Sequence, residues 1–127
     1  MLSPPAKRGT YPYWNEPSWS RSEKAIARTA FDAALKRELR EVMQETKRLA
    51  NQIREPAKLW DLEHYLTQRH KEIDWKYDCR SSRLSHVLAK LLSENRIREE
   101  DLRGLPEDRL QAIRSVARIL VEDAVGF

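Results

Sequence analysis

Apolar positions recur with a helical period along most of this chain. Between Ser22 and Ile53 there is neither proline nor glycine, and Ser20 or Ser22 can cap the start of a helix. Six apolar residues fall on one stripe of this segment, and Thr46 fills the gap in it: Phe31, Leu35, Leu39, Val42, Leu49 and Ile53. The pattern predicts one amphipathic helix of about thirty residues, roughly 45 Å long.

A helix of this length is too long to be covered by the rest of a chain of 127 residues. We therefore expect its apolar stripe to meet a second copy of the protein in an antiparallel homodimer. Leu39 and Met43 lie four residues apart at the edge of the stripe, so they face the same way. The expected dimer interface consists of Leu35, Leu39, Val42, Met43 and Thr46.

Shorter helices follow the long one. Pro56 suits the first position of a second helix, on which Leu59, Leu62, Leu66, Ile73 and Tyr77 form the apolar core face. A third helix is expected from Ser81 to Asn95. The segment "REEDLRGL" predicts a short helical turn ended by Gly104, and Pro106 then begins a last helix that runs to about Glu122. Strand-like alternation is absent, so the fold class is all-α.

Three segments divide the chain. Four of the six prolines lie within the first 17 residues, and this density excludes a regular helix there. We expect residues 1–19 to form a proline- and aromatic-rich N-terminal extension. Residues 20–78 form the long-helix region that makes the dimer, and residues 79–127 form a helical head.

Charge and cysteine content indicate which surfaces are solvated and in which compartment the protein resides. Charged residues make up 35% of the chain, and the formal net charge is +4. Acidic and basic residues alternate, as is typical of solvated helix faces. The single cysteine, Cys79, excludes an internal disulfide and indicates a reducing compartment. Because no apolar run approaches the roughly 18 residues of a membrane span, we expect a cytoplasmic protein.

The second helix carries a second face that differs from its leucine stripe. At about 100° per residue, one side of the helix collects Trp60, His64, Thr67, Lys71, Trp75 and Asp78. Tryptophan surrounded by polar and charged residues is typical of protein-binding hot spots. This composition predicts a docking face. The alternative is that Trp60 packs against the long first helix.

Candidate catalytic and metal-binding chemistry is sparse. His64 and His70 are six residues apart, whereas helical metal ligands need three- or four-residue spacing. Cys79 has no base beside it, and three glycines offer no loop that would cradle a phosphate. We therefore expect no enzyme, metal or cofactor. A nucleic-acid binder is the remaining rival, but the six arginines between Leu92 and Arg118 are interspersed with six acidic residues.

Two segments of the chain carry a family resemblance. The first is "WSRSEKAIARTAFDAALKREL", residues 19–39, and the second is "LWDLEHYLTQRHKEIDWKYDCR", which begins at Leu59 and continues to Leu92. Both resemble the fluorescence recovery protein family, and the similarity extends from Trp19 to Val121. It implies an all-helical, cofactor-free dimer with a long helical stalk and a smaller helical head.

The resemblance also implies a partner. Members of that family bind the photoactivated orange carotenoid protein through its C-terminal domain and speed its return to the resting form. Their partner-binding patch has tryptophan, then histidine three residues on, aspartate four on and arginine ten on. Trp60 matches this pattern, but Glu63 and His64 reverse the order of acid and histidine, and His70 takes the arginine position.

Two further residues complete the expected partner-binding set. Arg69 directly precedes the position of the family's arginine, and His86 occupies the position of an aromatic residue of the head. Histidine lacks the permanent charge of arginine, so these departures place the identity of the partner in question more than the fold. The partner implied by the resemblance is therefore the orange carotenoid protein or a homologous carotenoid-binding protein. Docking of another protein by a similar helical dimer stays open as the alternative.

Overall fold

The computed structural model describes residues 18–77 and 83–124, and within these ranges every regular element is a helix. In chain order the elements are α1 (Arg21–Asn51), α2 (Pro56–Lys76), α3 (Leu84–Ser93), the 3₁₀ turn η2 (Glu99–Leu102) and α4 (Glu107–Ala124). The predicted all-α class is confirmed. The sequence also made predictions about residues 1–17, Asp78, Cys79 and Ser81, the expected start of the third helix, and these lie outside the described residues.

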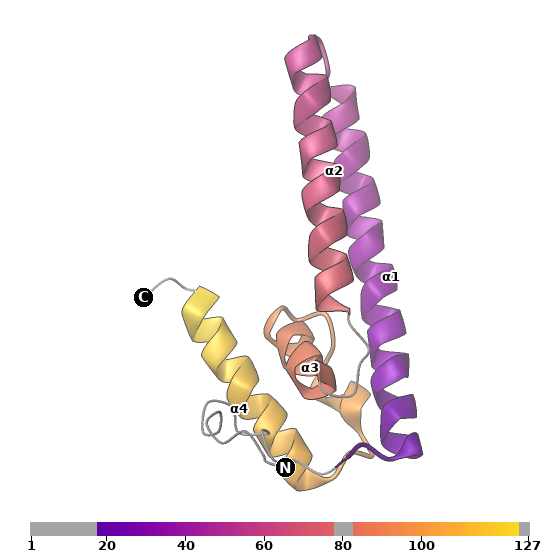
Figure 1. Cartoon of the computed structure of the whole chain (residues 1–127), viewed down its shortest axis with the longest axis vertical. Helices are drawn as coiled ribbons and strands as arrows, with labels where there is room; N and C mark the ends of the chain where they lie inside the picture. The colour runs from indigo at the N-terminus through magenta and orange to yellow at the C-terminus, as the bar shows by residue number, and fades with distance from the viewer. Residues whose placement is uncertain (1–17, 78–82, 125–127) are drawn as a thin grey trace, which may run out of the picture.

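Helices α1 and α2 form an antiparallel hairpin, which we call the stalk (Figure 1). At the base of the stalk, α3, η2 and α4 gather into a smaller unit, which we call the head (Figure 1). The long stalk with a small C-terminal head is therefore as predicted. The antiparallel dimer stays a prediction.

Local signals set the ends of the stalk helices. Ser20 Oγ accepts a hydrogen bond from the amide of Glu23 at 3.1 Å, and Glu23 Oε1 accepts one from the amide of Ser20 at 2.9 Å. This capping box fixes the start of α1. Glu55 is extended, and Pro56 takes the first position of α2, where a missing amide proton costs no helical hydrogen bond.

The hydrophobic core lies in the head and includes the first half of α1. Phe31 and Ala34 of α1 are almost fully buried and belong to the same core cluster as Leu88, Leu91 and Ile113. The other members of the core are Trp19, Ala27, Ala30, Leu84, Val87, Ala89, Ile97, Leu102, Leu105, Val116 and Ala117. One core thus joins residues on both sides of the expected boundary at residue 78. The division into segments stays a prediction.

Head elements differ slightly from the expected bounds. Helix α3 ends at Ser93, two residues before the predicted Asn95, and Asn95 itself adopts φ 61° in the left-handed region. Gly104 ends the helical turn, as predicted, with φ +105°. A Cβ at Gly104 would lie 2.8 Å from Ile26 Cδ1. Glycine is therefore required here both by backbone conformation and by its close approach to α1.

Candidate protein-binding site

The distal stalk holds no buried residue. From Leu39 on α1 to Glu72 on α2, every residue is half-buried or exposed. Two helices that contact each other along one line cover only part of their apolar surface, and helices in water depend on such burial for stability. The distal stalk therefore leaves much of its apolar surface uncovered, unlike the helices that pack in the core.

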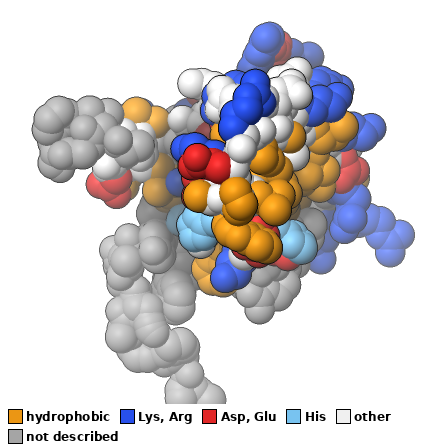
Figure 2. Space-filling view, turned by 90° about the horizontal axis from the view of Figure 1, so that it is seen from above, with side chains coloured by type: hydrophobic (Ala, Val, Ile, Leu, Met, Phe, Trp, Pro, Cys, Tyr) orange, Lys and Arg blue, Asp and Glu red, His pale blue; other side chains and the backbone are white. Residues whose placement is uncertain are grey.

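Besides Trp60, four large apolar side chains of the distal stalk are exposed: Leu39 at 43%, Met43 at 58%, Leu59 at 46% and Leu66 at 39%. Each of these residues lies about 90° around its own helix axis from the side that faces the other helix. On both helices, this rotation runs in the direction in which the chain winds toward higher residue numbers. Because the helices are antiparallel, both rotations turn toward the same side of the stalk. We call these four residues the apolar face. Seen from the tip, hydrophobic side chains gather along one side of the stalk, with histidines at the margins (Figure 2).

The sequence predicted this face only in part. Leu39 and Met43 are exposed on it, whereas the other expected dimer residues, Leu35, Val42 and Thr46, are half-buried. Leu59 and Leu66 were expected in the core of the chain. Their exposure corrects that prediction, because the stalk pairs only two helices and Ile73 is the one residue of α2 that is buried.

The predicted docking face of α2 is exposed. Trp60 is 63% exposed and Trp75 68% exposed, and His64, Thr67 and Lys71 between them are exposed as well. We call these five residues the outer face. Trp60 therefore does not pack against α1 of its own chain. A large aromatic side chain held out in solvent is typical of a protein-binding anchor.

Two of the predicted partner-binding residues, Glu63 and His64, lie close to Trp60 on α2. Glu63 is exposed and accepts a 3.4 Å hydrogen bond from Thr67 Oγ1. His64 lies about 40° from Trp60 on the other side. His70 is exposed, with Nε2 3.4 Å from a carboxylate oxygen of Asp74. The structure thus places Glu63 and His64 beside the tryptophan, whereas His70 lies about 80° around α2 and roughly 15 Å along it.

Arg69 and His86 lie elsewhere. Arg69 is about half a turn from Trp60 and faces α1, where it donates a hydrogen bond to Glu38 at 2.8 Å; it also donates one to Glu72 of its own helix at 2.6 Å. His86 is half-buried on α3 in the head, and burial lowers its pKa, with Arg83 and Lys90 adding to the effect. Neither residue joins Trp60 on the outer face. Their role in partner binding stays a prediction.

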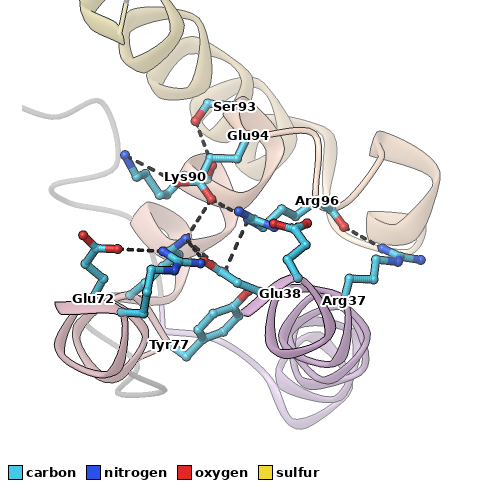
Figure 3. Close-up of polar contacts among 11 residues, drawn as sticks. Arg37, Glu38, Glu72, Tyr77, Lys90, Ser93, Glu94 and Arg96 are labelled. Atoms are coloured by element: carbon cyan, nitrogen blue, oxygen red, sulfur yellow. Dashed lines mark hydrogen bonds and ion pairs between the residues drawn. The ribbon is translucent and has the colours of Figure 1, made fainter. Parts of the chain in front are cut away.

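A buried carboxylate connects the stalk helices where they meet the head. The side chain of Glu38 is fully buried, and it accepts hydrogen bonds from Lys76 Nζ at 2.8 Å and from the Tyr77 hydroxyl at 2.9 Å, besides the one from Arg69. Arg96, which follows α3, places Nε 3.3 Å from the same carboxylate. Figure 3 shows these donors converging on Glu38 from both α2 and the head. We call this group the Glu38 cluster.

Arg96 and Lys76 extend the Glu38 cluster to a second acid. Each donates to Glu94 at 2.8 Å, and Arg96 also donates to Glu41 of α1 at 2.8 Å. The carbonyl oxygen of Arg96 accepts a hydrogen bond from Arg37 at 2.5 Å (Figure 3). Buried charges are tolerated when they are paired and hydrogen-bonded in this way. The cluster thereby fixes α2 against α1 and the head.

Ionisation in the Glu38 cluster follows from its contacts. Burial raises the pKa of Glu38, but hydrogen bonds from Lys76, Tyr77 and Arg69 outweigh burial, so the pKa lies below its usual value. Burial and the neighbouring Glu38 raise the pKa of the Tyr77 hydroxyl. At neutral pH the carboxylate is therefore charged and its phenolic partner remains a donor.

The Glu38 cluster was not predicted from the sequence, although one signal pointed to it. Glu38 stands on the apolar stripe of α1, three residues after Leu35 and four before Val42. An acid at such a position must find a buried partner. Its partners are far apart in the sequence, so the pattern within one helix does not name them.

Neither a metal site nor a membrane-spanning helix is found among the described residues. Among residues 18–77 and 83–124, no three histidine, cysteine, aspartate or glutamate side chains form a possible metal-binding group. In the same ranges, no helix is both long and apolar enough to cross a membrane. The expectation of a protein without metal or cofactor stays a prediction.

Comparisons with known proteins agree with the geometry. The family model described as "Photoprotection regulator fluorescence recovery protein" matches residues 19–117. The fluorescence recovery protein of Synechocystis sp. PCC 6803 is 36% identical over 104 residues, which cover 82% of this chain and 95% of that protein.

Solved structures give the same result. The Fremyella diplosiphon fluorescence recovery protein superposes with a TM-score of 0.75 at 37% identity, covering 80% of this chain and 99% of the other. The Synechocystis structure gives 0.74 at 36% identity, covering 79% and 98%. The similarity spans the stalk and nearly all of the described head, and begins at Trp19, where the expected extension ends.

Proposed function

The chain belongs to the fluorescence recovery protein family, and from this membership we propose that it is a non-enzymatic regulator of the orange carotenoid protein. It binds the photoactivated form of that protein through its C-terminal domain and accelerates the return to the resting form, which ends photoprotective quenching. The observation that carries the proposal is the family match over residues 19–117, a span that contains the exposed Trp60 and its charged neighbours.

The active form in this proposal is an antiparallel homodimer. The apolar face supplies the surface for a second copy, since it lies on one side of the stalk and holds four exposed large apolar side chains. Covering it would give the distal stalk the burial that it lacks within one chain. The outer face with Trp60 points away from α1, so it stays available for the partner in the dimer.

Acceleration requires a difference in affinity between conformations of the partner. A binding protein shifts a conformational equilibrium only by as much as it prefers one state over another. In this proposal the outer face binds the carotenoid protein more tightly on the way to its compact resting form than in its opened form. Catalytic groups are not needed for such a role.

Truncation of Trp60 provides the test at residue level. Trp60→Ala should weaken the acceleration by roughly thirtyfold, because hot-spot tryptophans typically contribute about 2 kcal/mol or more. The effect is measured as the concentration of variant that gives half-maximal acceleration of dark reversion. Trp60 is 63% exposed within the chain, so the fold should survive. Light scattering must first show an unchanged dimer, and an undiminished acceleration by Trp60→Ala would refute the assigned role.

A second candidate function is the docking of a different protein by the same helical dimer. The reversed order of Glu63 and His64, together with His70 at the position of the family's arginine, favours this alternative. Arginine offers a fixed fork of donors that histidine lacks. This alternative would be supported if the chain bound another protein through Trp60 and had no effect on the orange carotenoid protein.

A further inference from the structure

Basic side chains gather on one side of the first half of α1. Arg21, Lys24, Arg28 and Lys36 are all exposed. At about 100° per residue they fall within about 120° of one another around the helix, and they span roughly 22 Å along it. Between Arg21 and Lys36, Asp32 is the one acid on this side of the helix. We call the four bases, with Asp32 among them, the basic patch.

Ion pairs do not neutralise the basic patch. None of its four bases forms an ion pair among the residues that the structure describes. Glu23, the other acid in this part of α1, lies roughly 100–160° around the helix from the bases. Its carboxylate accepts hydrogen bonds from the Ser20 amide at 2.9 Å and from Arg109 Nη2 at 3.5 Å. Asp32 offsets one of the four positive charges, so three remain in excess.

Acids of the head lie on another side of α1. Gly104, which closely follows η2, approaches α1 at the side chain of Ile26. Ile26 lies about 160° around α1 from Lys24 and from Arg28. The acids of η2 therefore lie near the side of α1 opposite these two bases, and two of those acids accept hydrogen bonds from arginines of the head. The positive charge of the basic patch is thus uncompensated on its own side of the helix.

A second copy on the apolar face leaves most of the basic patch uncovered. Leu39 is the residue of the apolar face on α1 that lies nearest to the start of the helix. It is eleven residues, or roughly 16 Å, along α1 from Arg28. Lys36 borders the apolar face, whereas Arg21, Lys24 and Arg28 lie beyond it. Three of the four bases are therefore available to another partner in the dimer.

The composition of the basic patch selects among anionic partners. Between Arg21 and Lys36 no large apolar side chain is exposed, and the exposed Ala25 and Thr29 are small. Helices that bind a membrane surface insert large apolar side chains, so a lipid bilayer is a poor fit. A nucleic acid presents an unbroken row of phosphates, which Asp32 within the patch repels. A protein surface can instead present acids to the bases and a hydrogen-bond donor to Asp32.

We propose that the basic patch docks an acidic surface of the protein partner and steers the encounter with it. Exposed charges of one sign raise the rate of association with an oppositely charged surface more than they raise the final affinity. The proposal rests on the proposed function, since the partner is the carotenoid protein. In an antiparallel dimer the tip of one copy points toward the head of the other. Trp60 of one copy and the basic patch of the other therefore lie toward the same end of the dimer.

The test measures the association rate constant of full-length variants with photoactivated orange carotenoid protein. The double variant Lys24→Glu/Arg28→Glu should lower this rate constant about tenfold or more at about 0.01 M salt. At about 1 M salt it should lower the rate constant little, because salt screens exposed charges. The matched control is Arg103→Glu/Arg118→Glu, which makes the same change in net charge at two exposed positions of the head. The control should keep most of the wild-type rate, and both variants should remain dimers by light scattering.

Each outcome discriminates. Wild-type binding whose rate Lys24→Glu/Arg28→Glu leaves unchanged overturns the role of the basic patch and leaves the proposed function in place. Equal slowing by both double variants assigns the effect to net charge and also overturns that role. Absence of binding by the wild type overturns both proposals. Random-sequence duplex DNA and vesicles of phosphatidylcholine and phosphatidylserine are further probes. Tight binding of either one that Lys24→Glu/Arg28→Glu abolishes would assign the patch to that ligand and overturn the proposal.

Discussion

Replacing Glu38 with glutamine is expected to destabilise the protein by about 3 kcal/mol or more, because it leaves buried cations without their carboxylate. The Glu38 side chain is fully buried, and those of Lys76 and Arg96 are only 10% and 17% exposed. The loss should appear in chemical denaturation at fixed protein concentration. Glu45→Gln is the matched control, because Glu45 pairs with Arg48 at the surface of the same helix and its loss should change stability little.

The same substitution should alter the pH dependence of stability. The pKa of Glu38 in the folded protein lies below its ordinary value of 4.5. Its contribution to stability is therefore complete above that pH and is lost as pH falls through the folded-state pKa. Glu94 shifts in the same direction. Glu38→Gln should consequently show a flatter loss of stability in acid than the wild type, and two parallel acid profiles would contradict this assignment.

Met43→Glu should convert the dimer into monomers at micromolar concentration. Met43 is the most exposed residue of the apolar face within one chain, at 58%. In the dimer it would be covered, and an unpaired carboxylate there carries a desolvation cost of several kcal/mol. Leu39→Glu should act in the same way. Light scattering measures the mass, and helical content by circular dichroism shows whether each chain stays folded.

Gln44→Glu is the control for the dimer. It adds the same charge one residue along, at an exposed position about 100° around the helix from Met43. This variant should remain dimeric. A wild-type protein that is already monomeric at micromolar concentration would refute the dimer, and a dimeric Met43→Glu would place the interface elsewhere.

Most of the fold could be predicted because its signals are local. Ser20, Pro56 and Gly104 mark helix ends through backbone chemistry that depends on neighbours in the sequence. The stripe that begins at Phe31 gives the long helix through its period alone. The exposed side of α2 that carries Trp60 could be predicted for the same reason, since one helix brings its members together; its role in docking stays a prediction.

Other features depend on which side of a helix meets its neighbour. Arg69 was expected beside Trp60 on the partner-binding surface, but it lies on the side of α2 that faces α1, where Glu38 accepts a hydrogen bond from its guanidinium. Leu59 and Leu66 have the period of a core face, yet no third helix within residues 18–77 and 83–124 covers them. The helical spacing of apolar residues identifies the apolar side of a helix. Whether that side is covered by the same chain or by another is decided by tertiary packing.

The rate at which photoactivated orange carotenoid protein returns to its resting form in the dark tests directly whether this chain regulates it. Purified orange carotenoid protein is photoactivated, transferred to darkness and followed by absorbance as it returns to the resting form, with and without the full-length wild-type chain. We expect the return to become faster with increasing amounts of the chain and the rate then to saturate, as for a binding partner. A rate that stays unchanged at every molar excess of the chain would refute the proposed regulation.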